Sequence, residues 1–149
     1  MTLAQLQSLL IDDHGPLLAL VGRESREGGA TVPPATLLRG PIAGAVRDLG
    51  YPVADPLSAT SAEVEAVPAS QANELLARAG LRAMKLIRSR WYLFDESENG
   101  TSQDPTELLR QLAASIAAAE RSLGTDYGTQ RVRVPLVGRI DPLTDRGIR

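Results

Sequence analysis

Residues 70–94 read SQANELLARAGLRAMKLIRSRWYLF, and this stretch decides the fold. Its apolar residues recur at steps of three and four, which places them on one face of an α-helix. We therefore predict a long amphipathic helix from Ser70 to Phe94, held by packing of this face. Gly80 costs such a helix about 1 kcal/mol relative to alanine, and a close crossing by another helix would explain it. The apolar stripe consists of Ala72, Leu75, Leu76, Ala79, Ala83, Ile87, Trp91 and Phe94.

A second amphipathic helix is expected from Asp104 to Leu123. Asp104 is a favourable N-cap, Pro105 suits the first helical position, and Glu107 can reach back to the cap. Gly124 is expected to close the helix in a left-handed conformation. The apolar stripe consists of Leu108, Leu109, Leu112, Ile116, Ala119 and Leu123.

The N-terminal segment predicts one helix followed by a polar loop. Leucines at helical spacing follow Thr2, a residue suited to the N-cap, over residues 2–13. Gly15-Pro16 is expected to interrupt this helix because proline lacks a backbone N–H. Residues 23–34 are polar and contain glycine and proline pairs, which is typical of a loop.

Two further helices are expected in the middle of the chain. One covers residues 35–49 and ends at Gly50, which suits the left-handed position after a helix. Pro41 either kinks this helix or marks its first turn. The other helix is short and lies within residues 58–67, where Thr60 begins a capping-box sequence.

The composition limits the classes of protein to consider. A chain of 149 residues is the size of one ordinary domain. The absence of cysteine excludes disulfides and thiolate metal sites. The net charge of −2 gives no overall field that would attract nucleic acid or an anionic membrane. We expect neither a signal peptide, since the first residues lack a basic segment, nor a membrane span.

Catalysis has little support in the sequence. His14 is the only histidine, and we expect it to be solvated at a helix end. With one histidine and no cysteine, nucleophile–histidine pairs and multi-histidine zinc sites lack the necessary groups. The acidic stretch DESENG, residues 95–100, does not follow the EF-hand order and is expected to be a solvated loop. We therefore predict no enzymatic activity, no cofactor and no metal.

A basic stripe on the 70–94 helix is the first candidate interaction surface. Its members lie three and four residues apart, opposite the apolar face. They form either an ordinary solvated face or a contact surface for phosphate or an acidic neighbour. If the neighbour is a second copy, the acidic residues after Phe94 are the natural partner, in a heterologous contact that can close a ring. The basic residues are Arg78, Arg82, Lys85 and Arg88, and the acidic ones are Asp95, Glu96, Glu98 and Asp104.

The C-terminal segment has a different period. Residues 131–134 alternate arginine and valine, as an extended strand does. Pro135 and Pro142 exclude a central strand and favour an edge or an arm. Terminal disorder is the alternative, but the apolar content favours docking on another subunit, by addition of a strand to an exposed edge.

Together these patterns predict an all-α protein. We expect a small bundle of about four to five helices, in which the long central helix packs on the C-terminal helix. Residues 1–33 would form an N-terminal helical and loop extension, residues 34–124 the bundle core, and residues 125–149 an extended C-terminal arm.

The region from Ala35 to Gly124 resembles the head–tail connector, or adaptor, proteins of long-tailed bacteriophages. The resemblance lies in the order of parts. A helix ends in AVRDLG, residues 45–50, and a proline-bounded turn with a short helix follows over residues 51–68. A long Ala/Leu/Arg helix, a polar hairpin and a final amphipathic helix come next. Residues 1–34 have no clear counterpart in that pattern.

The resemblance implies a non-enzymatic structural protein of the virion neck, made in the host cytoplasm. Such proteins form a ring, dodecameric in the family, beneath the portal; genomic DNA passes through the lumen and a stopper or tail protein binds below. The acidic residues after Phe94 would face the lumen or a neighbouring subunit. The C-terminal arm would reach the portal through Arg131, Val132, Arg133, Val134, Leu136, Val137, Arg139 and Ile140.

Two alternatives to the adaptor stay open. One is a small helical regulator that binds nucleic acid through the basic stripe, whose affinity would fall steeply with salt. The other is a different phage neck component, such as a stopper or tail completion protein. Those families are rich in β structure, so a helical chain argues against them.

Overall fold

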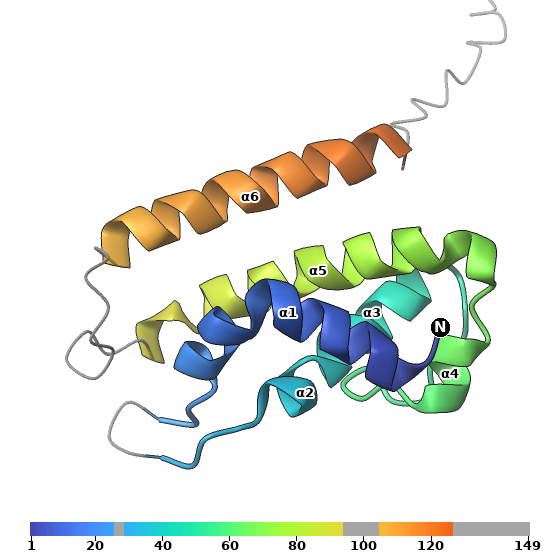
Figure 1. Ribbon diagram of the computed structural model, residues 1–149, viewed down its shortest axis with the longest axis horizontal. Coiled ribbons are helices and arrows are strands. Elements are labelled where there is room, and N and C mark those ends of the chain that lie inside the picture. Colours follow the sequence, from blue (N-terminus) through green and yellow to red (C-terminus); the bar gives the residue numbers. More distant parts are fainter. Residues whose placement is uncertain (26–28, 94–104, 127–149) are drawn as a thin grey trace, which may run out of the picture.

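The computed structural model describes residues 1–25, 29–93 and 105–126, and this part of the chain is built from helices (Figure 1). It contains no β-strand there, only an isolated antiparallel bridge between Arg23 and Thr31. The predicted all-α class is therefore confirmed. The elements are α1 (Leu3–Val21), α2 (Pro34–Leu37), α3 (Arg39–Asp48), α4 (Ser61–Glu65), the 3₁₀ turn η1 (Ala69–Gln71), α5 (Ala72–Ser89), the 3₁₀ turn η2 (Trp91–Leu93) and α6 (Pro105–Asp126).

The long helix α5 lies at the centre of the bundle. It contacts α3, α6 and α1, with α6 on one side and α1 and α3 on the other (Figure 1). α6 runs antiparallel to α5. The predicted packing of a long central helix on the C-terminal helix is confirmed. The predicted apolar stripe supplies the buried face of α5, including Leu75, Ala79, Ala83 and Ile87.

α1 is one continuous helix, so the predicted interruption at Gly15-Pro16 is wrong. A proline inside a helix costs about 3 kcal/mol. Beyond Pro16, however, Leu18 and Val21 continue the leucine stripe in phase and are fully buried. Burial of each such side chain contributes about 1.5–3 kcal/mol, so the two together offset the cost of the proline. α1, which the sequence assigned to an N-terminal extension, belongs to the same core cluster as α3 and α5.

Two capping boxes begin helices as their sequences suggest. The Thr2 side chain accepts the N–H of Gln5 at 3.2 Å, while the Gln5 side chain accepts the N–H of Thr2 at 2.9 Å. At α4, the Thr60 hydroxyl accepts the N–H of Glu63 at 3.4 Å, and the Glu63 carboxylate accepts the N–H of Thr60 at 2.8 Å. Gly50 follows α3 with φ +87°, the left-handed conformation predicted for it.

The helix predicted over residues 35–49 is divided into α2 and α3, with Leu38 between them. Pro41 lies in the first turn of α3. Of the two roles predicted for it, a kink or a first-turn position, the first-turn position is therefore confirmed. The N–H groups of a first helical turn have no intrahelical acceptor, so proline removes no hydrogen bond there.

The ends of the two long helices differ from the prediction. α5 ends at Ser89, and the 3₁₀ turn that follows directs Leu93 into the interior, where it is 3% exposed. α6 continues through Gly124 to Asp126, so the predicted closure at Gly124 is wrong. Gly124 does not have the positive φ that closure requires. The predicted N-cap, Asp104, lies outside the described residues, as does Phe94.

Candidate functional site

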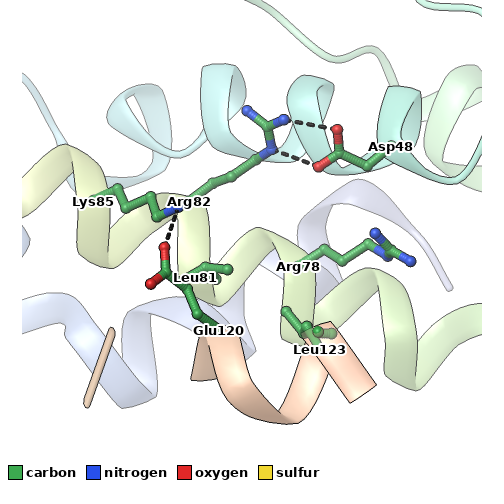
Figure 2. A pocket seen from close by; sticks show the side chains of 8 residues that line it. Asp48, Arg78, Leu81, Arg82, Lys85, Glu120 and Leu123 are labelled. Carbon is green, nitrogen blue, oxygen red and sulfur yellow. Dashed lines mark hydrogen bonds and ion pairs between the residues drawn. The ribbon is translucent and has the colours of Figure 1, made fainter. Parts of the chain in front are cut away.

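Three members of the basic stripe, Arg78, Arg82 and Lys85, line a cleft between α3, α5 and α6 (Figure 2). The cleft has a volume of about 290 Å³. Its floor is apolar, formed by Leu81 and Leu123, and its walls carry charged side chains from all three helices. The charged residues that line it are Asp48, Arg78, Arg82, Lys85 and Glu120.

Two of these cations bind carboxylates on the neighbouring helices. Arg82 donates two hydrogen bonds to Asp48 of α3, from Nε to Oδ2 at 2.8 Å and from Nη2 to Oδ1 at 2.7 Å. These bonds, the larger influence, raise the pKa of Arg82 above its ordinary value, against the opposing effect of burial. Lys85 Nζ lies 2.7 Å from Glu120 Oε1 of α6. The two pairs therefore connect α3 and α6 to the central helix.

Gly44 of α3 makes room for Arg82. A Cβ atom at position 44 would lie 2.6 Å from Arg82 Nη1, closer than real contacts allow. The guanidinium thus lies across the bare backbone of α3 before it reaches Asp48. Sequence reasoning did not identify Gly44, Asp48 or Glu120 as partners of the stripe; a glycine in the middle of a helix was the available signal.

Arg78 behaves differently from the other members of the stripe. Its side chain forms an ion pair with Glu74, one turn earlier in α5, and the residue is only 6% exposed. Figure 2 shows its guanidinium directed away from the two pairs described above. The expectation that the whole stripe lies opposite the apolar face is therefore wrong for Arg78. An arginine can be buried here because a carboxylate partner compensates the loss of hydration.

Arg88 and Lys85 are the exposed members of the stripe. Lys85 is half exposed, at 52% of its side chain, although it is paired. Arg88 and Lys85 are therefore the residues of the predicted subunit-contact face that remain accessible from outside. The acidic residues after Phe94 and the arm from Arg131 to Ile140 lie outside the described residues.

His14 is half-buried in the middle of α1, so the predicted solvated position at a helix end is wrong. Burial lowers its pKa below the ordinary value, and the nearby charge of Asp13 partly opposes this. Across the interface lies Gly80 of α5, where a Cβ would be 3.7 Å from both His14 Nε2 and Leu10 Cδ2. α1 therefore packs against α5 at Gly80, but at an ordinary van der Waals distance that would admit alanine, so the packing of α1 does not explain the glycine as predicted.

The described residues contain no group of three or more His, Cys, Asp or Glu side chains placed to hold a metal ion. Among the described helices, none combines the length and hydropathy that a bilayer crossing requires. The cleft carboxylates Asp48 and Glu120 bind Arg82 and Lys85 of the same chain, so these ion pairs connect the helices.

Comparisons with known proteins give no assignment. No protein-family model, no curated protein and no solved structure matches the chain.

Proposed function

We propose that this protein is a structural component of a phage virion: the adaptor ring that joins the portal to the tail. The observation that carries the proposal is the succession of helices from α3 to α6. A helix closed by Gly50 leads to a short helix between prolines, then to the long central α5 and to the antiparallel α6. This is the order of parts through which the sequence resembles the adaptor family.

In this proposal the protein has no enzymatic activity and needs no cofactor. Copies of the chain assemble into a ring, dodecameric as in the family, in the neck of the virion. Genomic DNA passes through the lumen without sequence-specific binding, and a stopper or tail protein binds the opposite side. The C-terminal arm, residues 131–140, contacts the portal.

The proposal is tested with the portal protein encoded in the same genome. The two purified proteins are mixed, cross-linked and imaged by cryo-electron microscopy. We expect a ring on the portal, with cross-links from the arm. A chain that ends at Asp126 keeps every described helix and should lose portal binding. The matched control replaces the exposed Leu57, far from the arm in sequence, with glutamine and should bind as the parent does. Equal binding by the truncated chain would remove the arm from the proposal, and no complex at any concentration would refute it.

The predicted subunit contact can be tested separately through its accessible charges. Arg88→Glu should weaken ring assembly if Arg88 faces the acidic residues of a neighbouring copy. Glu96→Lys should weaken it as well, and the two changes together should restore it. The matched control is Arg47→Glu, because Arg47 is an exposed arginine of α3. Arg110 is not used for this purpose because it is hydrogen-bonded to Glu107. Assembly that is unaffected by both single changes would exclude this contact.

The alternative of a nucleic-acid-binding regulator loses support from the cleft. Arg82 and Lys85 lie 2.7 Å from carboxylate oxygens of Asp48 and Glu120. Contact with phosphate would require these pairs to break, so the stripe offers less free positive charge than its sequence suggests. A duplex-binding assay at low salt checks this, since regulator binding would be strong there and fall steeply as salt is added.

A further inference from the structure

The cleft between α3, α5 and α6, which contains the Arg82–Asp48 and Lys85–Glu120 pairs, is called the ion-paired cleft below. A second hollow lies between α1, α5 and α6. We call it the α1 groove. Its volume is about 270 Å³, many times what a single water molecule needs, so it can accept aliphatic side chains. Its aliphatic lining includes Leu10, Leu76, Leu81, Met84, Ala119 and Leu123.

The rim of the α1 groove is acidic. Asp13 lines it, and Asp12 is next to Asp13 on the exposed side of α1. Within the described part of the chain no cation pairs with either carboxylate. His14 also lines the groove, and because burial lowers its pKa it adds no positive charge at neutral pH. The groove thus presents an apolar floor beside unpaired negative charge.

The two hollows beside Leu123 differ in the segment they would accept. The ion-paired cleft contains three cations and two carboxylates, already bound to one another or to Glu74. A basic segment would be repelled there. In the α1 groove, by contrast, a segment that combines aliphatic and basic residues finds both an apolar surface and opposite charge.

The chain itself contains such a segment. Residues 127–149 carry five arginines and two aspartates, a side-chain charge of +3. They begin immediately after α6, four residues beyond Leu123 of the groove. From Leu123 to Asp126 the helix advances about 4.5 Å, whereas residues 127–131 can span about 17 Å when extended. Residue 131 and those after it can therefore turn back to the groove of their own molecule.

We propose that the arm of each chain docks in the α1 groove of the same molecule through residues 131–136. Val132 and Val134, which share a side of an extended strand, occupy the aliphatic floor. The long side chains of Arg131 and Arg133 reach the carboxylates of Asp12 and Asp13 at the rim. The arm is thereby stored on the bundle in the isolated protein.

This docking has a consequence for assembly that rests on the proposed function. A portal surface would have to compete with the α1 groove for the same arm residues. The docking itself is a property of the isolated chain, so its test uses no portal. A failure of docking leaves the adaptor proposal standing, and a failure of portal binding leaves docking standing.

The absence of native cysteine permits a direct test in the full-length protein. Val134→Cys is combined with Ala77→Cys, since Ala77 is an exposed position that lines the groove. The control combines Val134→Cys with Ser89→Cys, an exposed position on the same helix that lines a different hollow. After oxidation with diamide, we expect an intrachain disulfide in the first variant, at least about tenfold faster than in the control. This factor corresponds to about 1.4 kcal/mol of preference for the groove.

The contribution of charge is measured in the same variant. Changing Asp12 and Asp13 to lysine should slow the intrachain disulfide about tenfold, by replacing attraction with repulsion. Circular dichroism confirms that each variant keeps its helices. If Ala77→Cys impairs folding, Ser122→Cys provides a second groove position on α6.

Equal rates at groove and control positions would overturn the proposal. Disulfides that form between chains and increase with concentration would also overturn it, because they would indicate the arm of a second copy.

Discussion

The two helical glycines Gly44 and Gly80 should respond in opposite ways to the same change. Alanine favours a helix over glycine by about 1 kcal/mol. At Gly80 the new Cβ would lie 3.7 Å from its neighbours, an ordinary van der Waals contact. We therefore expect Gly80→Ala to raise the free energy of unfolding by about 1 kcal/mol, which raises the melting temperature by about 4 °C.

At Gly44 the helical gain is opposed by a collision. The new Cβ would lie 2.6 Å from Arg82 Nη1, so the guanidinium must leave its position beside Asp48. The pair is about one-third exposed on each side, and such partly exposed pairs contribute up to about 1 kcal/mol. The gain and the loss are of similar size, and we expect Gly44→Ala to leave stability near that of the parent.

A double-mutant cycle separates these two contributions. In an Arg82→Ala background the collision is absent, so Gly44→Ala should stabilise by about 1 kcal/mol there. Gly80→Ala should stabilise equally in both backgrounds, because position 80 faces α1. Urea unfolding followed by circular dichroism gives the free energies of the parent, the three single variants and the two double variants. If Gly44→Ala already stabilises the parent as much as Gly80→Ala does, Arg82 does not lie across Gly44 and the account of the cleft fails.

Three further predictions concern a titration, a salt bridge and a cap. Burial lowers the pKa of His14 in the folded state, so the unfolded chain binds the proton more readily. Stability should therefore fall as the pH drops from about 6.5 toward that lower pKa. His14→Gln should remove this pH dependence, which thermal melts across pH 5–8 would measure. Lys85 and Glu120 are about half exposed, so their coupling energy in a double-mutant cycle should be about 0.2–1 kcal/mol and should shrink at 1 M salt. A larger coupling energy that does not depend on salt would contradict a surface pair. Thr60→Ala should cost about 1 kcal/mol in urea unfolding, whereas Thr60→Ser should retain most of the stability.

Much of the fold was predictable because it rests on local patterns. The 3.6-residue periodicity of α5 and α6 is contained in contiguous sequence, as is the capping box of Thr60 and the left-handed Gly50. Each of these signals is decided by residues within about one turn of one another. The all-helical class and the central position of α5 follow from them.

The candidate surfaces, in contrast, depended on which helices lie across from one another. The sequence placed Arg78, Arg82 and Lys85 on one face of a helix but could not name their partners. Arg82 binds Asp48, which is 34 positions earlier in the chain, and Lys85 binds Glu120 of α6. The position of a charged residue in the sequence does not show which distant residue of opposite charge the fold will bring within 3 Å of it.

The sequence by itself determined that this protein is a helical bundle with a long amphipathic helix and capped neighbours. Only the tertiary structure decided that α1 continues through Pro16, that Arg78 is buried, and that His14 lies against Gly80. The physical reason is common to all three. A local penalty for a proline, a buried charge or a half-buried histidine is set against packing energy that exists only once distant helices meet, and that energy is larger.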